Sequence, residues 1–215
     1  METSRAAGPG LRDQGRPGLR ERKKQQTREA LSWAAVRLAV ERGLQNVLVE
    51  YIAAEAGVSP RTYNNYFSSK AEAITWRHLE RARRTADLLR ERPSSEPLWE
   101  SITSAVLAQA GDEQARPDPE WTAGVRLMIS EPELHGEFLK ASAAADRECA
   151  VAIAERTGTD ADRDLYPRLL AATVGAAIQV ANDQWLRADP PVPLTPLLRD
   201  ALSQIAAGLP APTTG

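Results

Sequence analysis

The stretch Ile52–Lys70 limits what this chain can fold into more than any other part of it. A short apolar helix runs into Gly57, where the chain must turn. Ser59-Pro60 then supplies a capping hydroxyl and a first-turn proline, which together start a second helix. That helix carries polar side chains outward, while Tyr63 and Phe67 anchor it inward. Two short helices joined by a glycine-containing turn, the second polar on its outer face, predict a helix-turn-helix.

The polar side chains of the second helix are suited to reading DNA. Arg61 can grip guanine through O6 and N7, and Asn64 or Asn65 can pair with adenine through N6 and N7. Other contacts would fall on phosphates, which position a protein without specifying sequence. The candidate DNA-binding residues are Ser59, Arg61, Thr62, Asn64, Asn65, Tyr66 and Lys70, with Ser59, Tyr66 and Lys70 expected on the backbone. A solvated polar face is the alternative for the two asparagines.

Charge is unevenly distributed along the chain. Residues 1–70 contain 12 Lys and Arg and 7 Asp and Glu, a net charge of +5, whereas the other residues contain 15 and 22, a net charge of −7. A basic end on an acidic body is expected where one end meets a polyanion, and chance clustering is the alternative. Residues 1–24 are expected to form a disordered basic arm. Its basic run from residue 19 is either a solvated linker or an arm that follows phosphates.

A first helix, capped by Thr27 and ended by Gly43, would support the other two helices, with the second beginning at Val49. Its residues and those of the helix-turn-helix resemble the N-terminal domain of the TetR family of bacterial transcriptional regulators over roughly residues 25–72. The resemblance rests on Thr27-Arg28, Ala34-Ala35, Ala39-Val40-Glu41-Arg42-Gly43, Ile52-Ala53, Ala56-Gly57-Val58-Ser59, Thr62-Tyr63, Tyr66-Phe67 and Ser69-Lys70. It implies an all-helical homodimer whose C-terminal domain binds an effector and controls DNA binding. Leu48 stands where the family often has Thr, so one cap and phosphate contact are expected to be missing.

The remainder of the chain also reads as helical, and the predicted fold is all-α. Residues 25–70 would form the DNA-binding domain and residues 71–215 a helical ligand-binding and dimerisation domain. Further helices are expected over residues 70–92, 97–110, 117–130, 132–157, 160–189 and 196–207, because apolar residues recur there at helical spacing between Pro and Gly breaks. The last two would pair with a second copy as a four-helix bundle. The stripes that suggest this pairing are Leu170, Val174, Gly175, Ala177, Ile178 and Ala181, and Leu197, Leu198, Leu202 and Ile205; burial within one chain is the alternative.

Large apolar side chains of the C-terminal part are candidates for an effector pocket. The candidate ligand-binding residues are Trp99, Trp121, Met128, Phe138, Asn182 and Trp185, for which core packing is the alternative. His135 is assigned to the surface or to a cap. Segments 126–134 and 164–172 resemble a TetR subgroup associated with acyl-CoA-like ligands, which implies a lipophilic or acyl-CoA-like effector.

Several functional classes are disfavoured by what the sequence lacks. The single cysteine, Cys149, cannot form an internal disulfide, and no apolar run approaches a membrane span or a signal peptide, so a cytoplasmic protein without membrane contact is expected. Neither a metal site, a cofactor site nor a catalytic motif is recognisable. The leading hypothesis is a dimeric, ligand-responsive repressor of a palindromic double-stranded DNA operator. A small all-helical enzyme and a constitutive DNA-binding protein without effector are the alternatives.

Overall fold

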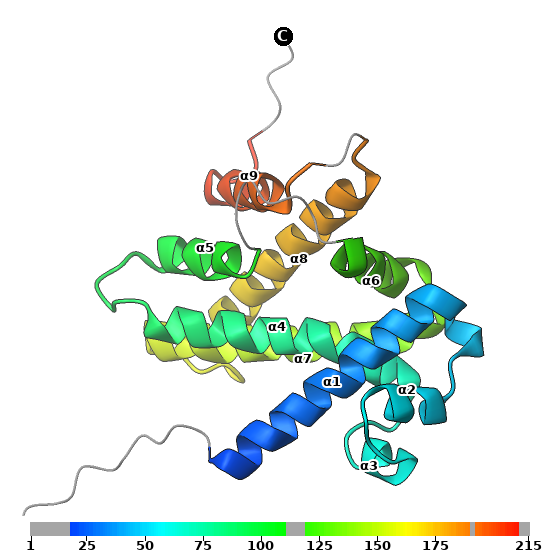
Figure 1. Cartoon of the computed structure of the whole chain (residues 1–215). Coiled ribbons are helices and arrows are strands. Elements are labelled where there is room, and N and C mark those ends of the chain that lie inside the picture. Colours follow the sequence, from blue (N-terminus) through cyan, green and yellow to red (C-terminus); the bar gives the residue numbers. More distant parts are fainter. Residues whose placement is uncertain (1–17, 111–118, 190–191, 211–215) are drawn as a thin grey trace, which may run out of the picture.

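The computed structural model describes residues 18–110, 119–189 and 192–210, apart from the side chains of residues 120 and 121. Within these ranges the regular structure is helical throughout, which confirms the all-α prediction (Figure 1). The elements are α1 (Leu19–Arg42), the 3-10 turn η1 (Leu44–Asn46), α2 (Val49–Glu55), α3 (Pro60–Asn64), α4 (Lys70–Glu91), α5 (Leu98–Ala108), α6 (Pro119–Ser130), α7 (Pro132–Thr157), α8 (Leu165–Arg187) and α9 (Leu194–Ala206). None of the helices in the described ranges combines the length and the hydropathy that crossing a bilayer requires.

The first helix begins earlier than the sequence patterns suggested. α1 starts at Leu19, so residues 19–24 are helical and not a disordered arm, whereas residues 1–17 lie outside the described part. Thr27 is not a cap, because its Oγ1 donates to the carbonyl oxygen of Lys23 at 2.9 Å inside the helix. The added turns are rich in Arg, Lys and Gln, which are strong helix formers. Adding turns to a helix that packing already stabilises costs little free energy, because the unfavourable nucleation step has already been made.

An aromatic cluster holds the helix-turn-helix together. Tyr63 and Phe67 are fully or almost fully buried, with ring centroids 5.9 Å apart, and Phe67 meets Trp76 of α4 edge-on at 6.2 Å. The Tyr63 hydroxyl donates to the carbonyl oxygen of Ser69 at 2.8 Å. Arg28 of α1 lies over the Phe67 ring at 5.3 Å and donates to the carbonyl oxygen of Tyr66 at 3.1 Å. The inward anchoring predicted for Tyr63 and Phe67 is therefore confirmed, and α1 is tied to the chain that follows α3.

α4 joins the helix-turn-helix to the rest of the molecule. Its N-terminus is capped by Ser69, whose side-chain oxygen accepts from the amide of Glu72 at 3.0 Å. Ser32 of α1 is buried and donates to the carbonyl oxygen of Ala73 at 2.6 Å. Beyond that point α4 lies along α7, and these two helices share the most extensive contact in the described structure. A displacement of α4 against α7 would therefore carry the helix-turn-helix with it.

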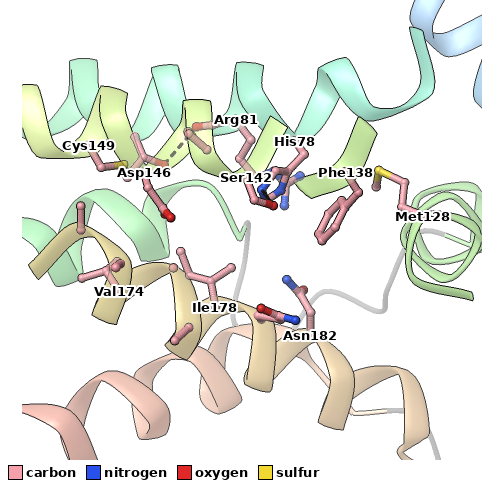
Figure 2. Close-up of a pocket in the computed structure, with 18 of the residues that line it drawn as sticks. His78, Arg81, Met128, Phe138, Ser142, Asp146, Cys149, Val174, Ile178 and Asn182 are labelled. Carbon is pink, nitrogen blue, oxygen red and sulfur yellow. Dashed lines mark hydrogen bonds between the residues drawn. The ribbon is translucent and has the colours of Figure 1, made fainter. Parts of the chain in front are cut away.

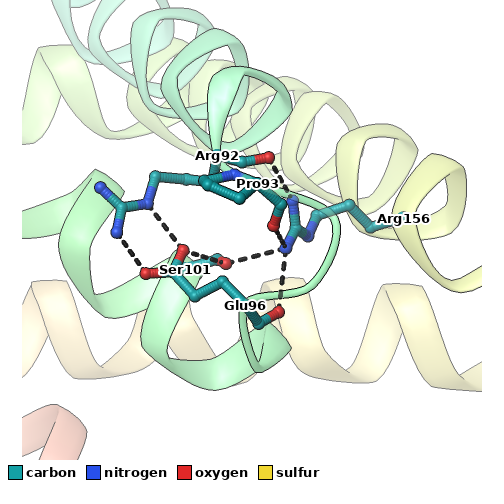
Figure 3. A network of polar contacts seen from close by, with 5 residues as sticks. All are labelled: Arg92, Pro93, Glu96, Ser101 and Arg156. Atoms are coloured by element: carbon teal, nitrogen blue, oxygen red, sulfur yellow. Dashed lines mark hydrogen bonds and ion pairs between the residues drawn. The ribbon is translucent and has the colours of Figure 1, made fainter.

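An arginine fixes the corner between α4 and α5 to the end of α7 (Figure 3). The Arg156 guanidinium donates to the carbonyl oxygens of Arg92, Pro93 and Glu96 at 2.9, 2.8 and 3.1 Å, and to Ser101 Oγ at 2.9 Å. The Glu96 carboxylate accepts from Arg92 and from Ser101, and these hydrogen bonds lower its pKa to about 2. One guanidinium group thus satisfies three backbone carbonyl oxygens at the corner where the chain turns from α4 to α5.

The two apolar sides of α8 have different environments. Val174, Ala177 and Ala181 are buried within the single chain, as are Leu198 and Leu202 of α9, so the stripes proposed for dimerisation mainly form intramolecular core. The opposite side of α8, called the bare side below, is apolar but exposed to solvent. Leu165, Leu169 and Val180 there are 75%, 57% and 63% exposed. An alanine-rich helix that is apolar all round does not reveal from periodicity which side faces the core.

Candidate functional site

The outer face of α3 presents the side chains expected to read DNA bases. Arg61 and Asn64 of α3 are exposed, as is Asn65, which follows the helix but keeps a right-handed helical backbone. The spacing of three and four residues therefore brings all three to one side, opposite buried Tyr63. Thr62 is half-buried at the edge of this face. The structure therefore brings together the polar atoms that base recognition would need.

Two of the residues expected to contact the DNA backbone, Ser59 and Lys70, form hydrogen bonds within the protein. Ser59 caps α3: its Oγ accepts from the amide of Thr62 at 3.1 Å and lies 2.9 Å from Thr62 Oγ1. α3 ends at Asn64, so Asn65 and Tyr66 belong to the following turn and not to the helix. The Lys70 Nζ donates to the carbonyl oxygen of Leu44 at 2.7 Å, which ties α4 to the η1 turn. Phosphate contacts by Ser59, Tyr66 and Lys70 stay predictions.

The start of α2 departs from the family pattern in the way the sequence suggested. Leu48 occupies the N-cap position of α2 with an extended backbone and no side-chain hydrogen bond, and it is 51% exposed. A hydroxyl at this position would satisfy one free amide of the first turn. The first turn of α2 therefore lacks that interaction.

A cavity of about 260 Å³ lies between α4, α6, α7 and α8 (Figure 2). Its walls are mostly apolar, and they include three of the predicted ligand-binding residues, Met128, Phe138 and Asn182. Trp99 and Trp185 are not among its lining residues; Trp185 is buried in the core of α8, and Trp99 packs against the core from α5. The side chain of Trp121 lies outside the described residues. The prediction thus included three of the four lining helices, α6, α7 and α8, but it missed α4 and added α5, which does not line the cavity.

Several polar side chains of the cavity were not predicted from the sequence, among them two on α4 and two on α7. His78 and Arg81 come from α4, and Ser142 and Asp146 from α7. His78 Nε2 lies 3.2 Å from Ser142 Oγ, and the imidazole packs on the Phe138 ring at 5.0 Å. Burial, reinforced by Arg81, lowers the pKa of His78, so this ring is neutral near pH 7. Helical spacing marks these positions only as partly polar, because the space exists only where α4, α7 and α8 meet.

Two hydrogen-bond acceptors face the cavity without a partner. The Asn182 Oδ1 is buried and unpaired, and the Asp146 carboxylate has no hydrogen bond or ion pair within the described part of the chain. Figure 2 shows Asp146 reaching from α7 and Asn182 from α8 into the same space. An unpaired buried acceptor costs free energy, which a ligand with a hydrogen-bond donor would recover.

Partial burial without a hydrogen-bond partner among the described residues makes Asp146 a source of pH-dependent instability. Its pKa is raised by desolvation, so the stability contributed by its protonated form is present in acid and lost as the pH rises through the folded pKa. Asp146→Asn is therefore expected to raise the melting temperature at neutral pH, and the gain should shrink in acid. Thermal unfolding between about pH 4 and pH 8 measures this. Asp162→Asn, in the exposed loop before α8, is the control, and a gain of constant size at every pH would contradict the burial argument.

The remaining reactive groups in the described structure suggest no chemistry. Cys149 lines the cavity, but burial raises its pKa to about 11, so it stays an unreactive thiol. His135 is exposed, with Nε2 3.3 Å from the carbonyl oxygen of Ile129, in keeping with the surface or capping role expected for it. Within the described ranges, His, Cys, Asp and Glu side chains form no group of three that could hold a metal ion.

Comparison with known proteins covers both parts of the chain. Residues 33–73 match the family described as bacterial regulatory proteins, tetR family, and residues 96–210 match the MftR C-terminal domain. The transcriptional regulator TcmR of Streptomyces glaucescens is 32% identical over 179 residues, covering 80% of this chain and 79% of TcmR. MftR of Mycobacterium tuberculosis is 28% identical over 192 residues, covering 87% and 93%.

A solved structure agrees with these sequence relatives. The complex of SmeT with triclosan matches with a TM-score of 0.56 at 18% identity, over 88% of this chain and 99% of SmeT. SmeT is described as the repressor of the multidrug efflux pump SmeDEF of Stenotrophomonas maltophilia. With a helix-turn-helix on a helical body, and relatives that match across both, the chain belongs to the TetR family of DNA-binding transcriptional regulators.

Proposed function

We propose that this protein is a repressor that binds a palindromic operator as a homodimer and leaves it when a lipophilic effector enters the cavity. The observation that carries this proposal is the pairing of an exposed base-reading face on α3 with a partly open cavity walled by α4, the helix that begins at the end of the DNA-binding head (α1–α3). Arg61, Thr62 and the two asparagines would read bases, while Ser59, Tyr66 and Lys70 would hold the backbone.

Contacts between the cavity walls and the head support control by an effector. α4 and α6 both line the cavity, and both pack on α1. The backbone of α6 approaches α1 closely at Gly124, where an added Cβ would lie 2.9 Å from Val36 Cγ1. The next residue, Val125, lines the cavity. An effector that favours a wider cavity would therefore favour a different position of the head, and the population would shift away from the operator-bound form.

The chemistry of the cavity indicates the class of effector. Apolar walls favour a lipophilic molecule, and the unpaired Asp146 carboxylate and Asn182 oxygen favour one that carries a hydrogen-bond donor. The volume of about 260 Å³ suits a compact ligand and would hold only part of an acyl-CoA. We propose a lipophilic effector with a hydroxyl or amine group. An acyl-CoA, which the subgroup resemblance implies, is the alternative effector that the experiment below tests.

The decisive experiment selects bound sequences from a random duplex pool. An operator with two inverted half-sites about one DNA turn apart, ~34–36 Å, is expected. Failure of the protein to enrich any sequence would refute the proposal.

Effector control is tested on the selected operator with two probes, triclosan and lauroyl-CoA. Release of DNA together with a raised melting temperature is expected for a ligand of the cavity. Release by lauroyl-CoA alone would overturn the compact-ligand version. Unchanged DNA binding across a wider library of lipophilic compounds would favour a constitutive DNA-binding protein.

The bare side of α8 is the proposed dimer interface. Leu165, Leu169 and Val180 form an apolar strip at helical spacing, and two such helices can pack across a two-fold axis. Changing both Leu169→Glu and Val180→Glu is expected to raise the dimer dissociation constant by about tenfold or more, because charges would be buried in the interface. Sedimentation velocity measures this. Leu139→Glu, at a 69% exposed position on α7, should leave the dimer intact, and equal effects of both changes would argue against this interface.

A further inference from the structure

The first turns of α1 form a charged helical extension beside the head. Residues 19–24 are exposed, yet the helix continues through them, so their backbone positions are fixed relative to the helix-turn-helix. Among the described residues, Arg20, Arg22 and Lys23 form no salt bridge, and Lys24 has only an exposed contact with Glu21 at 3.9 Å. Such an exposed pair contributes little. The extension therefore carries nearly its full positive charge.

Helical geometry separates these cations into two faces. Arg20 precedes buried Leu38 by five full turns of α1, so it lies on the side of the helix that is buried in its later turns. Lys24 precedes buried Leu31 by two turns and lies on the same side. Arg22 instead precedes Val40, which is 40% exposed, by five turns, and it points away.

A direct contact relates this face to the recognition surface. Arg28 continues the same side of α1 and donates to the carbonyl oxygen of Tyr66, in the turn that follows α3. At a rise of 1.5 Å per residue, Lys24 lies about 6 Å and Arg20 about 12 Å further along the axis. Figure 1 shows the start of α1 and α3 at the same end of the molecule, opposite α8 and α9. Two cations thus extend outward from the edge of the base-reading face.

We propose that Arg20 and Lys24 form a second DNA contact, which grips the phosphate backbone beside the groove that α3 enters. This inference rests on the proposed DNA-binding function. The ~6 Å between the two residues along the axis of α1 is short enough for both side chains to reach neighbouring phosphates of one strand. The contact adds affinity and salt dependence but carries no base information, so it acts alike on all sequences.

The test compares single charge removals on the two faces, Arg20→Gln and Lys24→Gln against the matched control Arg22→Gln. Fluorescence anisotropy gives the affinity of the full chain for the selected operator and for a scrambled duplex at several KCl concentrations. Arg20→Gln and Lys24→Gln are each expected to flatten the slope of log K against log salt by about 0.9 per subunit on both duplexes. Arg22→Gln should change it much less. All three positions are exposed, so unchanged melting temperatures are expected.

Equal slopes for the three variants would overturn the second contact. Loss of affinity on the operator but not on the scrambled duplex would also overturn it, since a phosphate contact is indifferent to sequence. These outcomes are distinct from failure of the proposed function itself, in which the unmodified protein enriches no sequence from the random pool.

Discussion

Arg61→Ala is expected to weaken binding to the selected operator by about 1–3 kcal/mol per half-site, and a symmetric dimer would suffer this loss twice. Arg61 is exposed on the face of α3 opposite buried Tyr63, so its removal leaves the aromatic anchor intact. The loss arises because guanine O6 and N7 would no longer meet a forked donor. Affinity for a scrambled duplex should fall far less, because only the positive charge is lost there.

Anisotropy titrations on both duplexes at matched salt measure this effect. Arg147→Ala, which removes an arginine whose side chain is 76% exposed on α7, is the control and should leave both affinities unchanged. Equal losses on operator and scrambled duplexes for Arg61→Ala would show that Arg61 contacts only phosphate.

Arg156→Ala is expected to lower the free energy of unfolding by about 2–4 kcal/mol. One guanidinium satisfies the carbonyl oxygens of Arg92, Pro93 and Glu96 and the hydroxyl of buried Ser101. Alanine would leave these acceptors without their donor at the corner between α4 and α5. Arg156→Lys should lose part of this amount, because an ammonium group keeps the charge but not the planar fork.

Urea denaturation of the full chain measures the change. Arg163→Ala is the matched control, since its side chain is 87% exposed and lies in the loop before α8. If Arg156→Ala and Arg163→Ala cost the same, the Arg156 network would not stabilise the α4–α5 corner.

Much of the head could be predicted from sequence because its signals are local. Gly57, Ser59 and Pro60 determine where one helix ends and the next begins, and the structure shows φ of +69° at Gly57 and a Ser59 cap. The start of α1 differs from the prediction because its signals are not all local. Thr27 has the chemistry of a cap, but propensity and packing of later turns carried the helix back to Leu19.

The cavity was predicted in part. Met128, Phe138 and Asn182 line it, whereas Trp99 and Trp185 do not. Size and hydrophobicity drew attention to the tryptophans, yet Trp185 fills the core. Asp146 could not be predicted as a lining residue, because a carboxylate on an alanine-rich helix is expected to face solvent unless a second helix covers it. Gly175 of α8 allows that approach, since an added Cβ would lie 2.8 Å from Asp146 Oδ1.

The sequence by itself determined the helix-turn-helix, the base-reading face of α3 and the all-helical body, because each depends on residues within a few turns of one another. Only the tertiary structure decided which side of α8 faces the core, where the cavity lies, and that the side of α1 carrying Arg20 and Lys24 contacts, through Arg28, the turn that follows α3. Those features arise where helices distant in sequence meet. A helical pattern specifies which residues share a side, but not which neighbour that side will contact.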